Sequence, residues 1–214
     1  SEMSNGQARR RARTHAALLG AALELLQEGR STASVEEITR RAGVGFGSFY
    51  NHFETKEDLF AEATYEVLDN YVMWLRGATQ DLSDPAAVFA RSFRLTGRLA
   101  GEQPHLLAPL LTQGTEVLLV ERGLREAALS DITEGIASGR FVEADPELLL
   151  MTVGGALLGL LRLLISDADR DAAETTDVVT ERLLCLLGLT RSEARRIVAG
   201  PLPADPDPRP WLPE

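Results

Sequence analysis

Residues 38–60 read ITRRAGVGFGSFYNHFETKEDLF, and this stretch decides how the rest of the chain is interpreted. Two short helical patterns meet at Gly43, a residue that permits a tight turn between helices. Aromatic residues alternate with small and polar ones after the glycine. Thr55, followed by an acidic pair, is typical of the start of another helix. The stretch therefore predicts a helix-turn-helix.

Helical patterns also fill the chain on both sides of this stretch. Apolar residues make up 44% of the sequence, enough for a core, and they recur at spacings of three and four, with Ala and Leu dominant and strand-like alternation nearly absent. The sequence predicts an all-α protein of about nine to ten helices. The expected helices cover residues 8–28, 34–41, 45–52, 55–76, 85–101, 104–109, 115–138, 147–165, 172–187 and a short last one from 190.

We expect three parts along the chain. Residues 1–56 form an N-terminal three-helix helix-turn-helix domain, and residues 57–200 form a larger C-terminal helical domain. Residues 201–214 include six prolines and are expected to form an irregular tail.

Charge is distributed unevenly along the sequence. Residues 1–56 hold eight Lys and Arg against six Asp and Glu, a net charge of +2. Because the whole chain has a net charge of −10, the remaining residues carry −12. Four arginines crowd at Arg9, Arg10, Arg11 and Arg13. A basic head on an acidic body fits a protein that meets phosphates at one end only. A plain solvated run of charge is the alternative for the first residues.

Cysteine usage and the N-terminal residues suggest a compartment. Cys185 is the single cysteine, so no internal disulfide can form, and we expect a reducing cytoplasm. In its apolar surroundings Cys185 is better explained as a small hydrophobic residue than as a redox group. No apolar segment typical of a secretory signal is visible near the N-terminus.

Motifs for catalysis are absent, so an enzyme is disfavoured. The three histidines, His15, His52 and His105, lie in separate segments, and no H-E-x-x-H, C-x-x-C or G-x-S-x-G occurs. We therefore expect no cofactor and no metal. The glycines of GVGFG suggest a phosphate-binding loop as an alternative, but that fingerprint follows a strand, and here a helix precedes it.

The helix-turn-helix stretch resembles the DNA-binding motif of the TetR family of transcriptional regulators. The matching residues are Ile38, Ala42, Gly43, Val44, Tyr50, His52, Phe53 and Lys56. The resemblance implies a dimeric repressor that binds a two-fold symmetric operator and is released by a small apolar or amphipathic molecule. The alternative is a helix-turn-helix regulator without such a ligand, acting through protein partners.

The resemblance also implies which residues contact DNA. Base edges would face Gly45, Phe46, Ser48 and Asn51, with Gly47 allowing close approach, and phosphates would be held by Ser34, Tyr50, His52 and Lys56. Asn51 is suited to adenine. Phe46 donates no hydrogen bond, so it either contacts a thymine methyl or turns inward toward Phe49.

By the same resemblance, the helices of residues 65–119 would enclose a ligand pocket. The candidate apolar lining is Trp74, Phe89, Phe93, Leu106, Leu110 and Leu118, and the polar candidates are Arg94, His105, Gln113 and Glu116. Mostly apolar walls with a few polar groups are typical of pockets. An ordinary core has the same composition.

Residues 147–165 are apolar almost all round and admit three interpretations. A membrane span is possible by length, but Arg162 lies within the segment. Burial in the chain's own core is the second, and contact with a second copy is the one we favour, because Gly155 and Gly159 allow close helix approach. The predicted dimer interface consists of Gly155, Leu158, Gly159, Arg162, Leu183 and Leu187.

Overall fold

The computed structural model describes residues 2–203, with side chains from residue 6 onward. Over these residues the chain forms ten α-helices and one 3₁₀ helix, and no strand occurs within them. The predicted all-α fold is confirmed. Residues 204–214, most of the predicted Pro-rich tail, lie outside the described residues.

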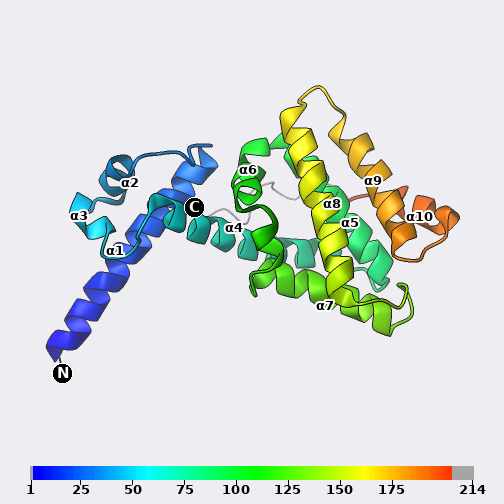
Figure 1. Cartoon of the computed structure of the whole chain (residues 1–214), viewed down its shortest axis with the longest axis horizontal. Coiled ribbons are helices and arrows are strands. Elements are labelled where there is room, and N and C mark those ends of the chain that lie inside the picture. The colour runs from blue at the N-terminus through cyan, green and yellow to red at the C-terminus, as the bar shows by residue number, and fades with distance from the viewer. Residues whose placement is uncertain (1, 204–214) are drawn as a thin grey trace. The chain divides into compact units, whose positions relative to one another are not determined.

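The chain forms two compact units, and the division falls inside α4 (Lys56–Thr79), between Val67 and Leu68. The first unit holds the N-terminal part of α4 together with α1 (Glu2–Gln27), α2 (Val35–Ala42) and α3 (Phe46–Phe49) (Figure 1). Helix α2 packs against both α1 and α3. The core of the first unit is built from fully buried side chains: Leu18, Leu25, Ile38, Phe49 and Leu59.

The second unit begins with the C-terminal part of α4 and continues through the remaining helices (Figure 1). These are α5 (Pro85–Glu102), α6 (Pro104–Gln113), the 3₁₀ helix η1 (Gly114–Leu118), α7 (Gly123–Ala137), α8 (Pro146–Ser166), α9 (Ala172–Leu186) and α10 (Arg191–Val198). Helix α5 packs against α8 and α9, and α7 packs against α8. Asp84 and Asp145 accept hydrogen bonds from the first turns of α5 and α8, as the Asp-Pro pairs predicted.

Close approach of α5 and α9 depends on two glycines on α5. A Cβ atom added to Gly97 would overlap the side chain of Thr176, and one added to Gly101 would lie 2.5 Å from the Ala172 Cβ. Thr176 is fully buried, so it has little room to move. The small residues of α5 therefore set the distance between these two helices.

The prediction of one continuous helix over residues 115–138 is wrong. The structure interrupts it after Leu118, and α7 begins only at Gly123. Arg122 is extended (φ −152°, ψ 165°), and its Nε donates to the Asp69 carboxylate of α4 at 2.9 Å. A Cβ at Gly123 would overlap the same carboxylate. The helix break therefore coincides with the contact of Arg122 and Gly123 with Asp69 of α4, which the local sequence does not indicate.

Candidate functional site

The turn between α2 and α3 has the geometry that residues 38–60 predicted. Gly43 ends α2 in the left-handed region (φ 66°), where a side chain would be strained. The Gly43 N–H donates to the Arg40 carbonyl at 3.2 Å, and Val44 N–H donates to the Thr39 carbonyl at 3.0 Å. These bonds close α2 and direct the chain into α3.

The α3 segment, residues 45–52, buries one phenylalanine ring of α3 and exposes two other aromatic rings. Phe49 is fully buried, whereas Phe46 is 54% exposed and Tyr50 55% exposed. The rings of Phe46 and Tyr50 meet edge to face with centroids 5.7 Å apart. Phe46 is therefore not turned into the core. It forms an aromatic ridge on the surface with Tyr50, beside exposed Gly45, Gly47 and Asn51.

Helix α3 is also shorter than predicted. It ends at Phe49, not near His52. Asn51 N–H donates to the Ser48 carbonyl at 3.3 Å, and His52 N–H donates to the Phe49 carbonyl at 2.9 Å, which are bonds of a tighter turn. Gly47 and Asn51 both have low helix propensity, which explains why the helix does not continue.

Two residues predicted to hold phosphates already have partners inside the protein. The Ser34 hydroxyl oxygen accepts from Glu37 N–H at 3.2 Å, the expected helix cap. The Lys56 ammonium donates to the carbonyls of Thr32 and Ala33 at 3.1 and 3.3 Å. Lys56 thus fixes the loop before α2, and only part of its hydrogen-bonding capacity is available to a phosphate.

His52 follows α3 and is half-buried. Its ring lies near His15 of α1. Its ring centroid is 5.7 Å from that of His15, which stacks on Phe53 and bonds to Glu62 at 3.0 Å. Burial lowers the pKa of His52, and the charges of His15 and Arg11 lower it further. A neutral His52 at physiological pH offers a hydrogen bond to a phosphate, not a full charge.

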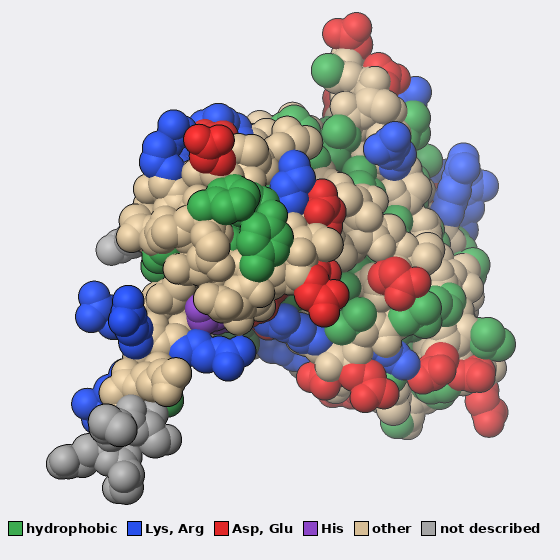
Figure 2. Space-filling model, turned by 60° about the vertical axis from the view of Figure 1, so that its left-hand side comes forward, with side chains coloured by type: hydrophobic (Ala, Val, Ile, Leu, Met, Phe, Trp, Pro, Cys, Tyr) green, Lys and Arg blue, Asp and Glu red, His purple; other side chains and the backbone are tan. Residues whose placement is uncertain are grey.

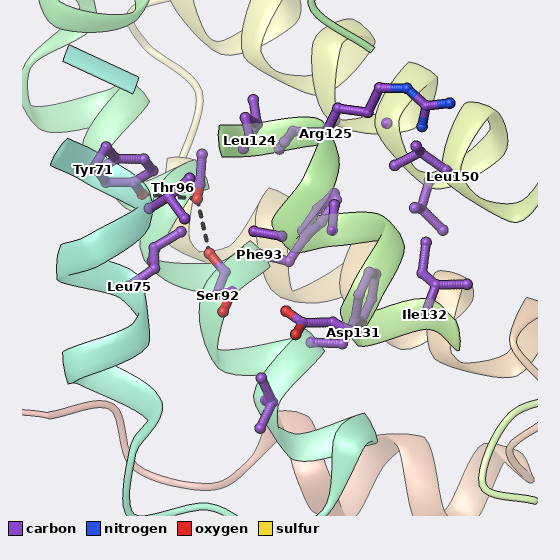
Figure 3. A pocket seen from close by; sticks show the side chains of 18 of the residues that line it. Tyr71, Leu75, Ser92, Phe93, Thr96, Leu124, Arg125, Asp131, Ile132 and Leu150 are labelled. Carbon is purple, nitrogen blue, oxygen red and sulfur yellow. Dashed lines mark hydrogen bonds between the residues drawn. The ribbon is translucent and has the colours of Figure 1, made fainter. Parts of the chain in front are cut away.

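The second unit contains a partly open cavity of about 170 Å³ lined by residues of α4, α5, α6, α7 and α8 (Figure 3). Its walls are mostly apolar, and four of the ten residues predicted to bind a ligand line it: Phe89, Phe93, Leu110 and Leu118. Further apolar walls come from Val72, Leu75, Leu124, Ala128, Ile132, Leu150 and Val153. An apolar cavity of roughly 150 Å³ is large enough for one benzene ring.

Polar groups reach this cavity from three helices. The Tyr71 hydroxyl bonds to Thr96 Oγ1 at 2.8 Å, and Thr96 Oγ1 donates to the Ser92 carbonyl at 2.8 Å. Burial raises the pKa of Tyr71, which keeps its hydroxyl neutral. Figure 3 shows the Asp131 carboxylate directed from α7 toward the space between α7 and Ser92 of α5.

Asp131 and Arg125 are the two charged groups of α7 in this lining. Partial burial raises the pKa of Asp131, although its side chain is still 43% exposed and Arg76, 3.6 Å away, opposes the rise. The Arg125 side chain is 13% exposed and donates from Nη2 to Glu147 at 2.8 Å, but its buried Nε has no hydrogen-bond partner among the described residues. Asp131 is an acceptor in the lining, and Arg125 is a lining residue with a buried donor that has no partner among the described residues.

Family comparisons match both units of the chain. Residues 18–63 match the family described as "Bacterial regulatory proteins, tetR family". Residues 84–200, more than half of the chain, match "Tetracyclin repressor-like, C-terminal domain". The chain belongs to the TetR family. It is therefore a helix-turn-helix transcriptional regulator.

Curated relatives of this TetR-family chain resemble it over a limited segment. The helix-turn-helix transcriptional regulator Rv2912c of Mycobacterium tuberculosis is 43% identical over 67 residues, 31% of this chain and 34% of its own length. The repressor DhaR of Mycobacterium sp. is 37% identical over 60 residues, 28% of this chain and 30% of its own. The chain thus matches about a third of the length of these curated relatives.

One solved structure is similar over nearly the whole chain. RolR in complex with resorcinol superimposes with a TM-score of 0.80 and 28% identity, covering 92% of this chain and 98% of RolR. The helices of both TetR-family units therefore have counterparts in that protein.

Six of the residues predicted to bind a ligand do not line the cavity. They are Trp74, Arg94, His105, Leu106, Gln113 and Glu116. Arg94 shows the reason most clearly, because its Nε donates to Asp177 at 2.9 Å and its Nη1 donates to the Gly200 carbonyl at 2.8 Å. Arg98 donates to the same carboxylate at 2.9 Å. Arg94 joins α5 to α9 and to the segment that follows α10.

The ionisation of Asp177 reflects this network. Burial alone would raise the pKa of the carboxyl, but hydrogen bonds from Arg98 and Arg94 outweigh it and lower the pKa. His105 and Glu116, by contrast, are exposed.

The sequence-based prediction also missed the contribution of α7 to the cavity. Asp131, Ala128 and Ile132 lie on one side of that helix, in the segment AALSDITEGI. The signal was an acidic residue between apolar ones at helical spacing. The predicted pocket ends at residue 119, so α7 lies outside it in the sequence prediction.

The predicted dimer interface divides into exposed and buried residues. Gly155, Gly159 and Arg162 are exposed on α8. Leu158, Leu183 and Leu187 are 9%, 7% and 0% exposed, so they were wrongly predicted to contact a second copy and belong to the chain's own core. The exposed apolar residues on the two helices are instead Leu148, Leu163, Val178 and Leu186.

Helix α8 is long and apolar enough to cross a membrane, with a mean hydropathy of 2.2. Length and composition alone are weak support for a span, because core helices of globular proteins pass the same test. Its buried side, which includes Leu150, Val153 and Leu161, packs within the second unit.

Proposed function

We propose that this TetR-family regulator is a cytoplasmic homodimeric repressor that binds a two-fold symmetric operator and is released when a small molecule fills the cavity of the second unit. The observation that carries the proposal is the partly open cavity of about 170 Å³, with apolar walls and a buried Arg125 Nε that has no partner among the described residues. Apolar walls with a few polar groups are typical of small-molecule sites.

The chemistry of the walls favours a ring-sized effector that carries hydroxyl groups. The volume suits a single aromatic ring. Asp131 would accept a hydrogen bond from a ligand hydroxyl, and Arg125 Nε would donate to a ligand oxygen. Resorcinol, the dihydroxybenzene bound by RolR, has this size and these groups, which supports the same class of effector here.

A stripe of residues on α8 supports dimerisation. Leu148, Thr152, Gly155, Gly159 and Arg162 are exposed and follow one another at spacings of four and three. This spacing places them along one side of the helix. Leu186 and Val178 on α9 are each 45% exposed. A second copy packed on these faces would bury apolar surface at a close helix crossing and provide two copies of α3 for two half-sites.

Effector release would require the ligand to distinguish two states of the dimer. A hundredfold change in operator occupancy corresponds to a difference of about 2.7 kcal/mol in ligand affinity between those states. Helix α4 is the covalent link through which this preference would act. Its first part contributes Leu59 to the core of the first unit, and its second part contributes Tyr71 to the cavity.

A fluorescence-anisotropy titration tests the proposal, using duplex DNA from immediately upstream of the protein's own gene. We expect binding at low salt, and release by resorcinol or a related monocyclic phenol. Sedimentation equilibrium is expected to give the mass of a dimer. Binding that no member of a phenol panel releases would instead favour a helix-turn-helix regulator that acts through protein partners. Absence of DNA binding by folded protein would contradict both.

Replacing Asp131 by Asn is expected to raise stability at neutral pH and to weaken effector response. The pKa of Asp131 is raised in the folded state. The free energy of unfolding of the protein therefore falls as the pH rises from the unfolded-state pKa of 3.8 to the folded-state pKa, and it stays lower at higher pH. Asn removes that loss and also removes the carboxylate acceptor. Urea unfolding at several pH values, with anisotropy titrations of effector release, measures both effects.

The matched control is Asp169→Asn, an exposed aspartate of the same unit with the same change in charge. We expect this control to leave effector release unchanged. If Asp131→Asn and Asp169→Asn respond to the effector equally, Asp131 has no part in ligand binding.

A further inference from the structure

The N-terminal part of α1 carries an exposed cluster of arginines that the helix-turn-helix itself does not use. Helix α1 begins at Glu2, earlier than the predicted residue 8. Every residue from 6 to 13 is exposed. None of the four arginines, Arg9, Arg10, Arg11 and Arg13, pairs with a carboxylate among the described side chains.

The helical geometry makes this segment a projecting arm. At 1.5 Å per residue, the turns before His15 extend about 20 Å. Arg9 and Arg13 are four residues apart and share one side of the helix, where like charges destabilise it. A helical segment without core contacts is marginal in water, so a negatively charged surface would stabilise it by removing this repulsion.

The arm starts next to a residue predicted to contact phosphate. His15 lies within stacking distance of Phe53 (5.1 Å between centroids) and 5.7 Å from His52. Arg11, one turn earlier, is close enough for its charge to lower the pKa of His52. Figure 2 shows Lys and Arg side chains gathered on this end of the first unit, beside a histidine. The arginines of α1 therefore approach the chain just after α3, at His52.

We propose that the arginine-rich turns of α1 form a second DNA-contact element, which binds backbone phosphates adjacent to those bound by the α3 segment. Guanidinium groups bind phosphate oxygens in a bidentate manner, and the element holds only arginines. Such contacts add affinity without reading base sequence. The inference rests on the proposed operator binding by the first unit.

The test compares the salt dependence of DNA binding by the full chain and by the double variant Arg9→Gln, Arg13→Gln. The probe is a duplex from upstream of the protein's own gene, and an unrelated duplex of equal length serves for non-specific binding. Each lost phosphate contact should reduce the slope of log K against log salt by about 0.9, and a dimer carries two arms. We expect a shallower slope and weaker binding to both duplexes, with the preference for the upstream duplex unchanged.

The control variant Arg195→Gln, Arg196→Gln removes the same charge from exposed positions on α10 and should keep the wild-type slope. Circular dichroism verifies that all variants are folded. If wild-type protein binds and the arm variant retains the wild-type slope, the second contact element is excluded. If wild-type protein does not bind the duplex at all, the proposed operator binding fails instead.

Discussion

Replacing Phe49 by Ala is expected to lower the free energy of unfolding of the first unit by about 3–5 kcal/mol and to abolish DNA binding. Phe49 is fully buried and contacts the rings of Tyr50 and Phe53, with centroids 5.2 and 5.9 Å away. Truncation would leave a void where α3 meets the core. Urea unfolding followed by far-UV circular dichroism, with anisotropy titrations on the upstream duplex, measures both losses.

Phe46→Ala is the matched control, because Phe46 lies three residues earlier on the same helix. Since Phe46 is 54% exposed, its truncation should change the unfolding free energy by less than about 0.5 kcal/mol. DNA affinity should nevertheless fall, with a changed preference at thymine positions. Equal destabilisation by both variants would contradict the structure of α3, and an unchanged operator preference would show that Phe46 reads no base.

Replacing Gly97 by Ala is expected to destabilise the second unit by about 1–3 kcal/mol, even though Ala favours helix over Gly. The added methyl group overlaps Thr176, which is fully buried at the contact of α5 with α9. The helices can accept it only by moving apart, and that movement also strains the bonds of Arg94 and Arg98 to Asp177. Thermal and urea unfolding measure the loss.

Gly77→Ala makes the same substitution in α4, where nothing lies within 4 Å of the added carbon. This control should stabilise the protein by about 0.5–1 kcal/mol, because Ala restricts the unfolded chain and Gly77 is in an exposed helical turn. A stabilising effect at Gly97 as well would mean that α5 and α9 are not in close contact.

Local chemistry explains which helix boundaries could be predicted from the sequence. Asp84-Pro85, Asp145-Pro146 and the Thr190–Glu193 capping box each act within one turn, and the structure confirms all three. The break at Arg122 could not be predicted, because it depends on Asp69, which lies 53 residues earlier in the chain.

The same distinction separates the site residues that could be predicted from those that could not. The turn at Gly43 follows from a single residue type, so the helix-turn-helix was evident. Leu183, Leu186 and Leu187 look alike in the sequence LLCLL, yet only Leu186 is exposed. Arg94 has its partner Asp177 83 residues later, so no local pattern distinguished a structural arginine from a ligand-binding one.

The cavity has a consequence for how an effector can be found. A molecule that binds the folded state stabilises it, and at a concentration a hundredfold above its dissociation constant it contributes about 2.7 kcal/mol. The melting temperature of the protein alone therefore reports binding. A panel of small ring compounds can be ranked by thermal shift before the operator is known.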